Sequence, residues 1–291
     1  FILGLFVLEN LSRKKAQYHS LAKGGFKKKS KSILNGYKAV LAFSFCALIF
    51  FISFLFPVLQ MLYWTIIFPK HLADLNLIEL FFNTTILVFL SSIVLISFSF
   101  ISNYVNRLSK SNFLEILTTF SISGYAMPGI ILAVAFITFI SWFDNNIVAY
   151  FKLETIKSIF IGSIIGLVVV YFIRFYSLAS NGIKSGYLKI SYSIDESAYL
   201  LGYSKFKTFK DIHIPYLKNS ILLIGILIAI EIIKELPITL IMRPFNFETF
   251  ATQAYIYASQ DLLEAAAAPS LFLILIASFF ILITSRYILK D

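Results

Sequence analysis

The segment SIDESAYLLGYSKFKTFKDIHIP, Ser193 to Pro215, is a charged island between two hydrophobic runs. Hydrophobic residues make up 59% of the 291 residues and charged residues make up 14%, against roughly 25% charged residues in an ordinary soluble domain. A soluble domain of this length would need a far more polar surface. The composition therefore indicates an integral membrane protein, in which the island is a loop between two spans.

Six apolar runs are long enough to form membrane-spanning helices, each of which needs about 20 residues. They cover residues 38–66, 80–102, 116–140, 158–177, 217–237 and 268–287. We expect the first, long run to tilt or bend near Pro57. The chain opens on an apolar stretch, 1–9, which is too short to span and looks like the end of a preceding membrane helix. We therefore predict an all-α membrane protein with a basic linker, 10–37, and a six-helix bundle over 38–291.

The lysine and arginine residues predict how these spans are oriented. Alternate segments between the runs hold 20 of them on one side and five on the other, and basic residues collect in cytoplasmic loops. Both ends of the six-helix unit, and the island, are therefore expected in the cytoplasm. Lysine-rich loops also account for the net charge of +10 without a nucleic-acid partner.

The island itself has the local pattern of two short helices. Ser193 and Glu196 have the spacing of a capping box at a helix start, and Gly202 stands where a left-handed residue would end that helix. Ser204 can cap a second helix, which we expect to end at Pro215 before the next span begins. The sequence thus predicts a helix, a sharp turn and a second helix.

The second of these helices is amphipathic. Phe206, Phe209 and Ile212 share one face at helical spacing, and three lysines line the other. The residue types leave two alternatives open. The apolar face could dock into a groove of a soluble partner, or the helix could lie on the membrane with its lysines toward lipid phosphates.

The spacing of the island resembles the EAA loop of ABC importer permeases, which reads Glu-Ala-Ala, three residues, Gly, nine residues, Ile-x-Leu-Pro. Glu196-Ser197-Ala198, Gly202 and Ile212-His213-Ile214-Pro215 match this pattern, with Ser197 and Ile214 as mild departures. The resemblance implies that the island is a coupling loop that docks on a cytoplasmic ABC ATPase dimer. The implied coupling residues are Glu196, Ser197, Ala198, Gly202, Phe206, Phe209, Ile212 and Pro215.

Further stretches resemble ferric-iron importer permeases in particular. They are Lys234-Glu235-Leu236-Pro237 with Leu240, 243–247, Ala251 and Tyr255, together with 124–129 and the Leu8-Glu9 junction before the basic run. The resemblance implies the C-terminal half of a double-length permease in a bacterial inner membrane, with the other half fused upstream or supplied by a second copy. It also implies a periplasmic substrate-binding protein as partner. Permeases for thiamine, polyamines or phosphonates share these features and remain alternatives.

Charged residues near the end of the fifth run are candidates for the translocation pathway. Glu231 and Lys234 can pair at i, i+3, and Glu231 and Glu235 are expected on one face of the helix. Ionisable groups in spans face a cavity or a partner, so these residues either contact a passing cation or form an internal ion pair that orients the helix. Pro237 is expected to end this helix.

Polar and irregular residues elsewhere have comparable alternatives. Asn83 suits an interhelical hydrogen bond or a place on the pathway. Pro128 can bend or break the third span, either as a packing kink or as a gate element. Arg243, Phe245 and Asn246 are expected outside the membrane, where they could dock the binding protein or simply form a loop.

The chain has no motif for catalysis or for nucleotide binding. It lacks a phosphate-binding Gly-rich loop with Lys-Ser/Thr, and it has no clustered nucleophile, base or metal set. Its three histidines are widely scattered, and the single Cys46 excludes an internal disulfide. We therefore expect a transport subunit that binds no cofactor, with ATP on the partner. An ion-driven secondary transporter is the rival class, but it would want charges near mid-membrane and internal repeats.

Overall fold

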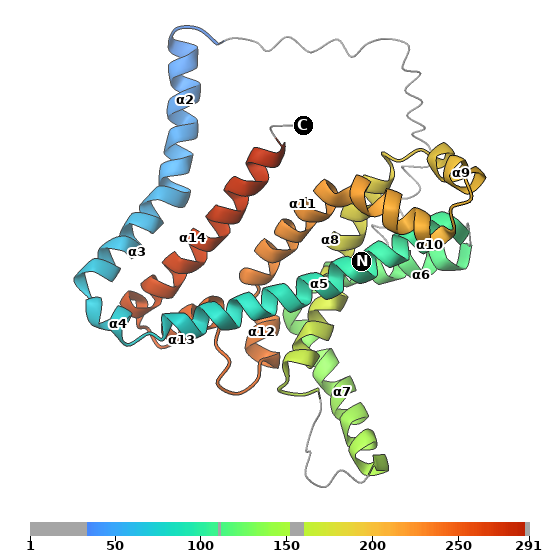
Figure 1. Cartoon of the computed structure of the whole chain (residues 1–291). Helices are drawn as coiled ribbons and strands as arrows, with labels where there is room; N and C mark the ends of the chain where they lie inside the picture. Colours follow the sequence, from blue (N-terminus) through green and yellow to red (C-terminus); the bar gives the residue numbers. More distant parts are fainter. Residues whose placement is uncertain (1–33, 110–111, 152–159, 289–291) are drawn as a thin grey trace. The chain divides into compact units, whose positions relative to one another are not determined.

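The computed structural model describes residues 34–109, 112–151 and 160–288 (Figure 1). Residues 1–9 and most of the predicted linker therefore lie outside the described residues. The chain divides into two units, residues 1–58 and 59–291. The first is described from residue 34, and the second contains both hydrophobic cores.

The described part of the first unit, from residue 34, is mainly a helix with one irregular turn. It contains α2 (Tyr37–Phe50), the π turn η1 (Phe51–Leu55) and the start of α3 (Phe56–Ile67), and no residue of α2 or η1 is buried. The amide of Phe56 bonds to the carbonyl of Phe51, five residues back. Because this shift directly precedes Pro57, which has no amide donor, the helix passes the proline without ending.

Three long helices form the main core of the second unit: α5 (Leu77–Ser109), α8 (Ile164–Tyr187) and α11 (Ile214–Ile233), which all pack against one another. Leu95 of α5, Leu167 of α8 and Ile228 of α11 are completely buried in it. Figure 1 shows α9 (Tyr192–Leu200) and α10 (Lys205–Thr208) near one end of these helices, and α12 (Pro237–Met242) near the other.

A smaller core joins α4 (Pro69–Ala73) and the start of α5 to α13 (Phe250–Ser259) and α14 (Leu263–Ile288). Leu80, Phe250 and Ala268 are buried there, and the rings of Phe250 and Phe272 stack with centroids 5.7 Å apart. This core positions the loop between α12 and α13.

The described residues contain six helices long and apolar enough to cross a membrane, as predicted. They are Tyr37–Ile67, Leu77–Ser109, Gly129–Asn146, Ile164–Tyr187, Lys205–Ile233 and Leu263–Arg286. These described residues form helices and connecting turns only, so the all-α fold is confirmed. Several boundaries differ from the predicted ones because the helices continue past the apolar runs into polar sequence.

The predicted third run, 116–140, is broken at Pro128, which is one of the outcomes that its sequence allows. Helix α6 (Asn112–Ile122) passes into a 3-10 turn, η2 (Ser123–Ala126), and α7 (Gly129–Phe151) begins anew. Met127, the residue before Pro128, is extended with φ −82° and ψ 134°. A proline disfavours the helical conformation in the residue before it, so the helix stops here, and the predicted run 116–140 includes both sides of the break.

The fifth span begins earlier and ends earlier than predicted. One helical stretch runs from Lys205 through the π turn η3 (Phe209–His213) into α11, so the expectation that Pro215 ends a separate helix is wrong. The amide of Ile214 bonds to the carbonyl of Phe209, which again shifts the helical register just before a proline. The helix ends at Ile233, and Pro237 begins α12 rather than ending α11.

Candidate functional site

The island folds as a short helix, a glycine turn and a second helical stretch, as its sequence predicts, although the second stretch continues into α11. Gly202 has φ +82°, and the amide of Tyr203 closes the end of α9 on the carbonyl of Ala198 at 3.0 Å. Ser204 caps α10 by accepting a hydrogen bond from the amide of Lys207 at 3.3 Å. The N-cap of α9, however, is Ser191, so the predicted capping box from Ser193 to Glu196 does not form.

A buried ion cluster lies beneath α9. The carboxylate of Asp195 accepts a hydrogen bond from Arg107 Nε at 2.7 Å through one oxygen, and its other oxygen lies 2.8 Å from His213 Nε2. The side chains of Arg107, Asp195 and His213 are 6%, 9% and 0% exposed. The three residues come from α5, α9 and η3, so the cluster joins three separate helical elements.

The guanidinium of Arg107 also closes the end of α8. It donates to the carbonyls of Tyr187 at 3.3 Å, Ile190 at 3.0 Å and Ser191 at 3.0 Å. These oxygens follow the last turn of a helix, where carbonyls have no intrahelical partner. A buried cation with this many partners has little freedom, so Arg107 fixes α5, the end of α8 and the start of α9 relative to one another.

Aromatic rings surround the histidine and hold α10 and η3 to α5. The ring of His213 lies between those of Tyr104 and Tyr187, with centroids at 5.2 and 5.4 Å. Tyr104 donates its hydroxyl to the carbonyl of Lys205 at 2.6 Å, and its ring lies 4.7 Å from that of Phe209. Of the predicted apolar face, therefore, Phe209 packs inside the chain, whereas Phe206 is 73% exposed.

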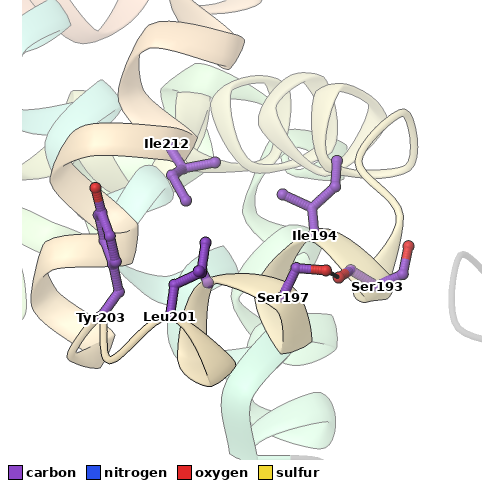
Figure 2. A pocket seen from close by; sticks show the side chains of 7 residues that line it. Ser193, Ile194, Ser197, Leu201, Tyr203 and Ile212 are labelled. Atoms are coloured by element: carbon purple, nitrogen blue, oxygen red, sulfur yellow. Dashed lines mark hydrogen bonds between the residues drawn. The ribbon is translucent and has the colours of Figure 1, made fainter.

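The outer surface of the island carries exposed apolar and charged side chains. Leu200 and Leu201 at the turn are 89% and 78% exposed, and the predicted coupling residues Glu196 and Ser197 are exposed as well. A pocket of about 350 Å³ opens between α9 and η3 (Figure 2). Its lining is Ser193, Ile194, Ser197, Ala198, Leu201, Tyr203 and Ile212. The island therefore has an exposed apolar surface of the kind that binds partners, and it is rigidly attached to the core.

The predicted pathway residues lie in different environments. Lys234 and Glu231 form the expected i, i+3 ion pair at 2.7 Å. Glu235 does not share their helical face, because α11 ends at Ile233; its side chain is 8% exposed and pairs with Arg174 at 3.5 Å. Asn83 donates a hydrogen bond from α5 to the carbonyl of Glu248 at 3.0 Å, and this partner lies in the loop before α13 rather than in a helix.

The loop between α12 and α13 presents a single exposed aromatic residue. Arg243 forms an ion pair with Glu248 and donates to the carbonyl of Phe247 at 3.2 Å, which closes the loop at its base. Phe245 at the tip is 98% exposed, and Asn246 adopts a left-handed φ of 58°. Arg243 thus shapes the loop, whereas Phe245 and Asn246 are available for contact.

Sequence reasoning missed four residues that organise these sites. Arg107 and Arg174 entered only the count of basic residues that predicted the orientation of the spans, and Arg174 lies within α8. No side-chain partner was predicted for Asp195, and His213 was one of three scattered histidines. The adjacent carboxylates Asp195 and Glu196 could have indicated a buried acidic residue. On a short helix that packs on a core, one of two adjacent residues faces inward.

Comparison with known proteins gives one relative in sequence. No protein-family model matches the chain. It is 21% identical over 280 residues to Fe(3+)-transport system permease protein FbpB 2 of Haemophilus influenzae, which covers 95% of this chain and 53% of the relative. The chain thus spans about half the length of that protein.

Two solved structures resemble the chain more fully. One is a bacterial ABC transporter involved in the import of the acidic polysaccharide alginate, with TM-score 0.66 and 16% identity, over 85% of this chain and 94% of that chain. The other is a bacterial alginate ABC transporter in complex with an alginate pentasaccharide-bound periplasmic protein, with TM-score 0.67 and 16% identity, over 85% and 93%. This chain has the fold of an ABC importer permease.

The permease fold gives the island and its ion cluster a common interpretation. The similar proteins are transport components rather than enzymes, in agreement with the sequence, which has no catalytic motif. Within this fold, the island is a polar segment between two spans, and Arg107, Asp195 and His213 tie it to the long helices.

Proposed function

We propose that this chain is a permease half of an ATP-driven importer, and that the island is its coupling loop. The observation that carries the proposal is the ion cluster of Arg107, Asp195 and His213, which attaches an exposed apolar turn to α5, α8 and α11. An external force on α9 would therefore move three core helices together. The match in fold to ABC importers supports the same assignment.

The partner that exerts this force is an ABC ATPase dimer in the cytoplasm. Leu200, Leu201 and Phe206 provide an apolar contact surface, and the pocket between α9 and η3 accepts a side chain from the partner. Glu196 and the island lysines surround this surface with charge, which favours correct orientation during docking. ATP-driven closure of the dimer then draws two coupling loops together, and the permease alternates between its two accessible states.

The second half of the transporter is fused upstream or is a second copy, because two such units are needed to enclose a path. In this arrangement both ends of the six-helix unit are cytoplasmic, in a bacterial inner membrane. The pathway candidates are Asn83, Pro128, Glu231, Lys234 and Glu235, since each lies at a helix break, an ion pair or a contact between a helix and a loop.

Ferric iron is the proposed substrate, on the basis of the sequence relative and the stretches that resemble iron permeases. Thiamine, polyamines and phosphonates are the competing substrates within the same class. The test is uptake by the intact transporter, reconstituted in proteoliposomes with the ATPase and binding protein encoded beside it, using radioactive ferric citrate and each competitor. ATP-dependent uptake of ferric citrate alone is expected, whereas uptake that persists without the ATPase would indicate an ion-driven secondary transporter.

The exposed loop at Phe245 should be a docking point for the periplasmic binding protein. Phe245→Ser is expected to weaken binding-protein affinity by about 10-fold or more, since truncating an aromatic anchor that is buried at an interface costs about 2 kcal/mol or more. The measurement is titration of the purified transporter with its binding protein. Leu262→Ser in the neighbouring turn is the control, because it removes a partly exposed apolar side chain outside the loop. Equal affinity of the Phe245 variant and wild type would refute the docking role.

A further inference from the structure

Arg174 connects two interruptions in the helical framework. The first is the break of the third span at Met127, whose carbonyl accepts a hydrogen bond from Arg174 Nη1 at 2.9 Å. The second is the link between α11 and α12, where Glu235 Oε2 lies 3.5 Å from Arg174 Nε. One side chain from the continuous helix α8 thus reaches both places where neighbouring helices stop.

The groups that Arg174 and Glu235 contact are those that the breaks leave without helical partners. Met127 is extended and lies between η2 and α7, so its carbonyl accepts no bond within a helix. Glu235 Oε1 accepts a hydrogen bond from the amide of Ile238 in the first turn of α12, at 3.3 Å. Broken helices are tolerated within a membrane where such groups find side-chain partners, so this pair stabilises both interruptions.

The glycine that starts α7 leaves room for this arrangement. A β-carbon at Gly129 would lie 3.0 Å from Arg174 Nη1 and 3.0 Å from Glu235 Oε1. Gly124, in the 3-10 turn, is packed against α8 in a similar way, since a β-carbon there would lie 2.2 Å from the carbonyl oxygen of Ile173. Both glycines therefore bring the broken span against the part of α8 that carries the arginine.

The contact is weaker than the one that anchors the island. Arg107 donates to a carboxylate at 2.7 Å and to three carbonyls, and its position is fixed. Arg174 has one carbonyl and one carboxylate at 3.5 Å, and its buried Nε makes no hydrogen bond. Arg174 is also 20% exposed, whereas Arg107 is 6% exposed, so this pair can separate at a lower energetic cost than the cluster beneath α9.

Glu235 depends on Arg174 for its charge. Burial raises the pKa of the Glu235 carboxyl, and the Arg174 guanidinium opposes that rise. Loss of the arginine therefore leaves a buried carboxyl without its main counter-charge. The neighbouring Lys234 is mostly exposed and bonds to Glu231.

We propose that Arg174 and Glu235 are positioning residues of the transport cycle, whose ion pair holds the broken third span against the α11–α12 link and separates when the permease changes conformation. The pair acts as a latch that holds this conformation. The proposal rests on the proposed transport function. It places the contact that opposes the conformational change between the break before α7 and the link between α11 and α12.

The contact itself is tested by a double-mutant cycle in the intact protein purified in detergent. Arg174→Gln and Glu235→Gln should each lower the Tm by about 5 °C or more, because each leaves a buried charge without its partner. The double variant should melt no lower than the worse single variant. Glu231→Gln with Lys234→Gln, which removes the more exposed ion pair nearby, should shift the Tm by less than about 2 °C. Additive losses for Arg174 and Glu235 would show that they do not interact and would overturn the proposal.

The role in transport is tested by ATP hydrolysis per assembled complex, measured without binding protein. Both single variants should hydrolyse ATP faster than wild type, by about 5-fold or more, because the latch no longer opposes the conformational change. Gly129→Ala should act in the same way by pushing the pair apart, whereas Gly225→Ala, which meets only the end of the Ile96 side chain, should not. If the variants show non-additive changes in Tm but hydrolyse ATP at the wild-type rate, the pair has only a structural role, and the proposal is overturned. The wild-type control separates the two proposals. If no ATPase binds the wild-type protein, the proposed function is wrong, and the latch role, which depends on it, is wrong as well.

Discussion

Asp195→Asn is expected to abolish coupled transport and to destabilise the permease by about 3 kcal/mol or more, because it leaves Arg107 as a buried cation without its carboxylate. The amide would also present a donor to one of two groups that now donate, Arg107 Nε or His213 Nε2. The island would then be held mainly by aromatic packing. Thermal unfolding in detergent and ATP-dependent uptake by the reconstituted transporter measure the two effects.

A matched control separates this effect from a general loss of charge in the island. Asp211→Asn changes an exposed carboxylate in η3, and it should leave the unfolding temperature within about 2 °C of wild type. A second comparison tests the cause. Because the penalty comes from an unpaired buried charge, Arg107→Met combined with Asp195→Leu should recover stability that Asp195→Leu alone loses. Wild-type stability and uptake in Asp195→Asn would contradict the anchoring role.

Gly202→Asp is expected to prevent stable association with the ATPase while the permease still inserts and folds. The residue has φ +82°, where most side chains cost about 1–2 kcal/mol, and a β-carbon there would meet nothing within 4 Å. The defect must therefore come from the turn and from a charge placed beside Leu200 and Leu201. Co-purification of the ATPase with the tagged permease measures it.

Gly202→Asn provides the informative comparison, because Asn tolerates the left-handed region and carries no charge. It should retain most of the association, whereas Gly202→Ala should lose part of it through backbone strain alone. If the Asp variant binds the ATPase as wild type does, the turn is not part of the contact surface and the docking proposal is wrong.

Local sequence patterns predicted the parts of the site that depend on near neighbours. The left-handed Gly202, the Ser204 cap and the Glu231–Lys234 pair each involve residues at most five positions apart, and each is present. The number of spans was equally accessible, because length and hydropathy determine it. These features follow from the geometry of a single helix or turn.

The remaining features depend on contacts that no local pattern contains. Arg107 and Asp195 are 88 positions apart, and Arg174 pairs with Glu235 across two different helices. Both arginines were counted only as basic residues, because an arginine that pairs within the bundle can be recognised only once its partner is known. The effect of proline was anticipated at Pro128, which can bend or break a span, but it was misjudged at Pro215. A proline ends a helix at one site and is accommodated at the other, depending on the hydrogen-bond register before it.

The π turn Phe209–His213 determines how far the proposed docking surface of the island is rotated about the axis of α11, the span that follows it. An α-helix advances by about 100° per residue, so adding or deleting one residue in this turn would rotate the island about the axis of α11 by that amount. The lipid-facing residues beyond Ile214 would keep their own phase. Inserting or deleting one residue here would thus reorient the surface toward an ATPase of different shape, without any substitution inside the bundle.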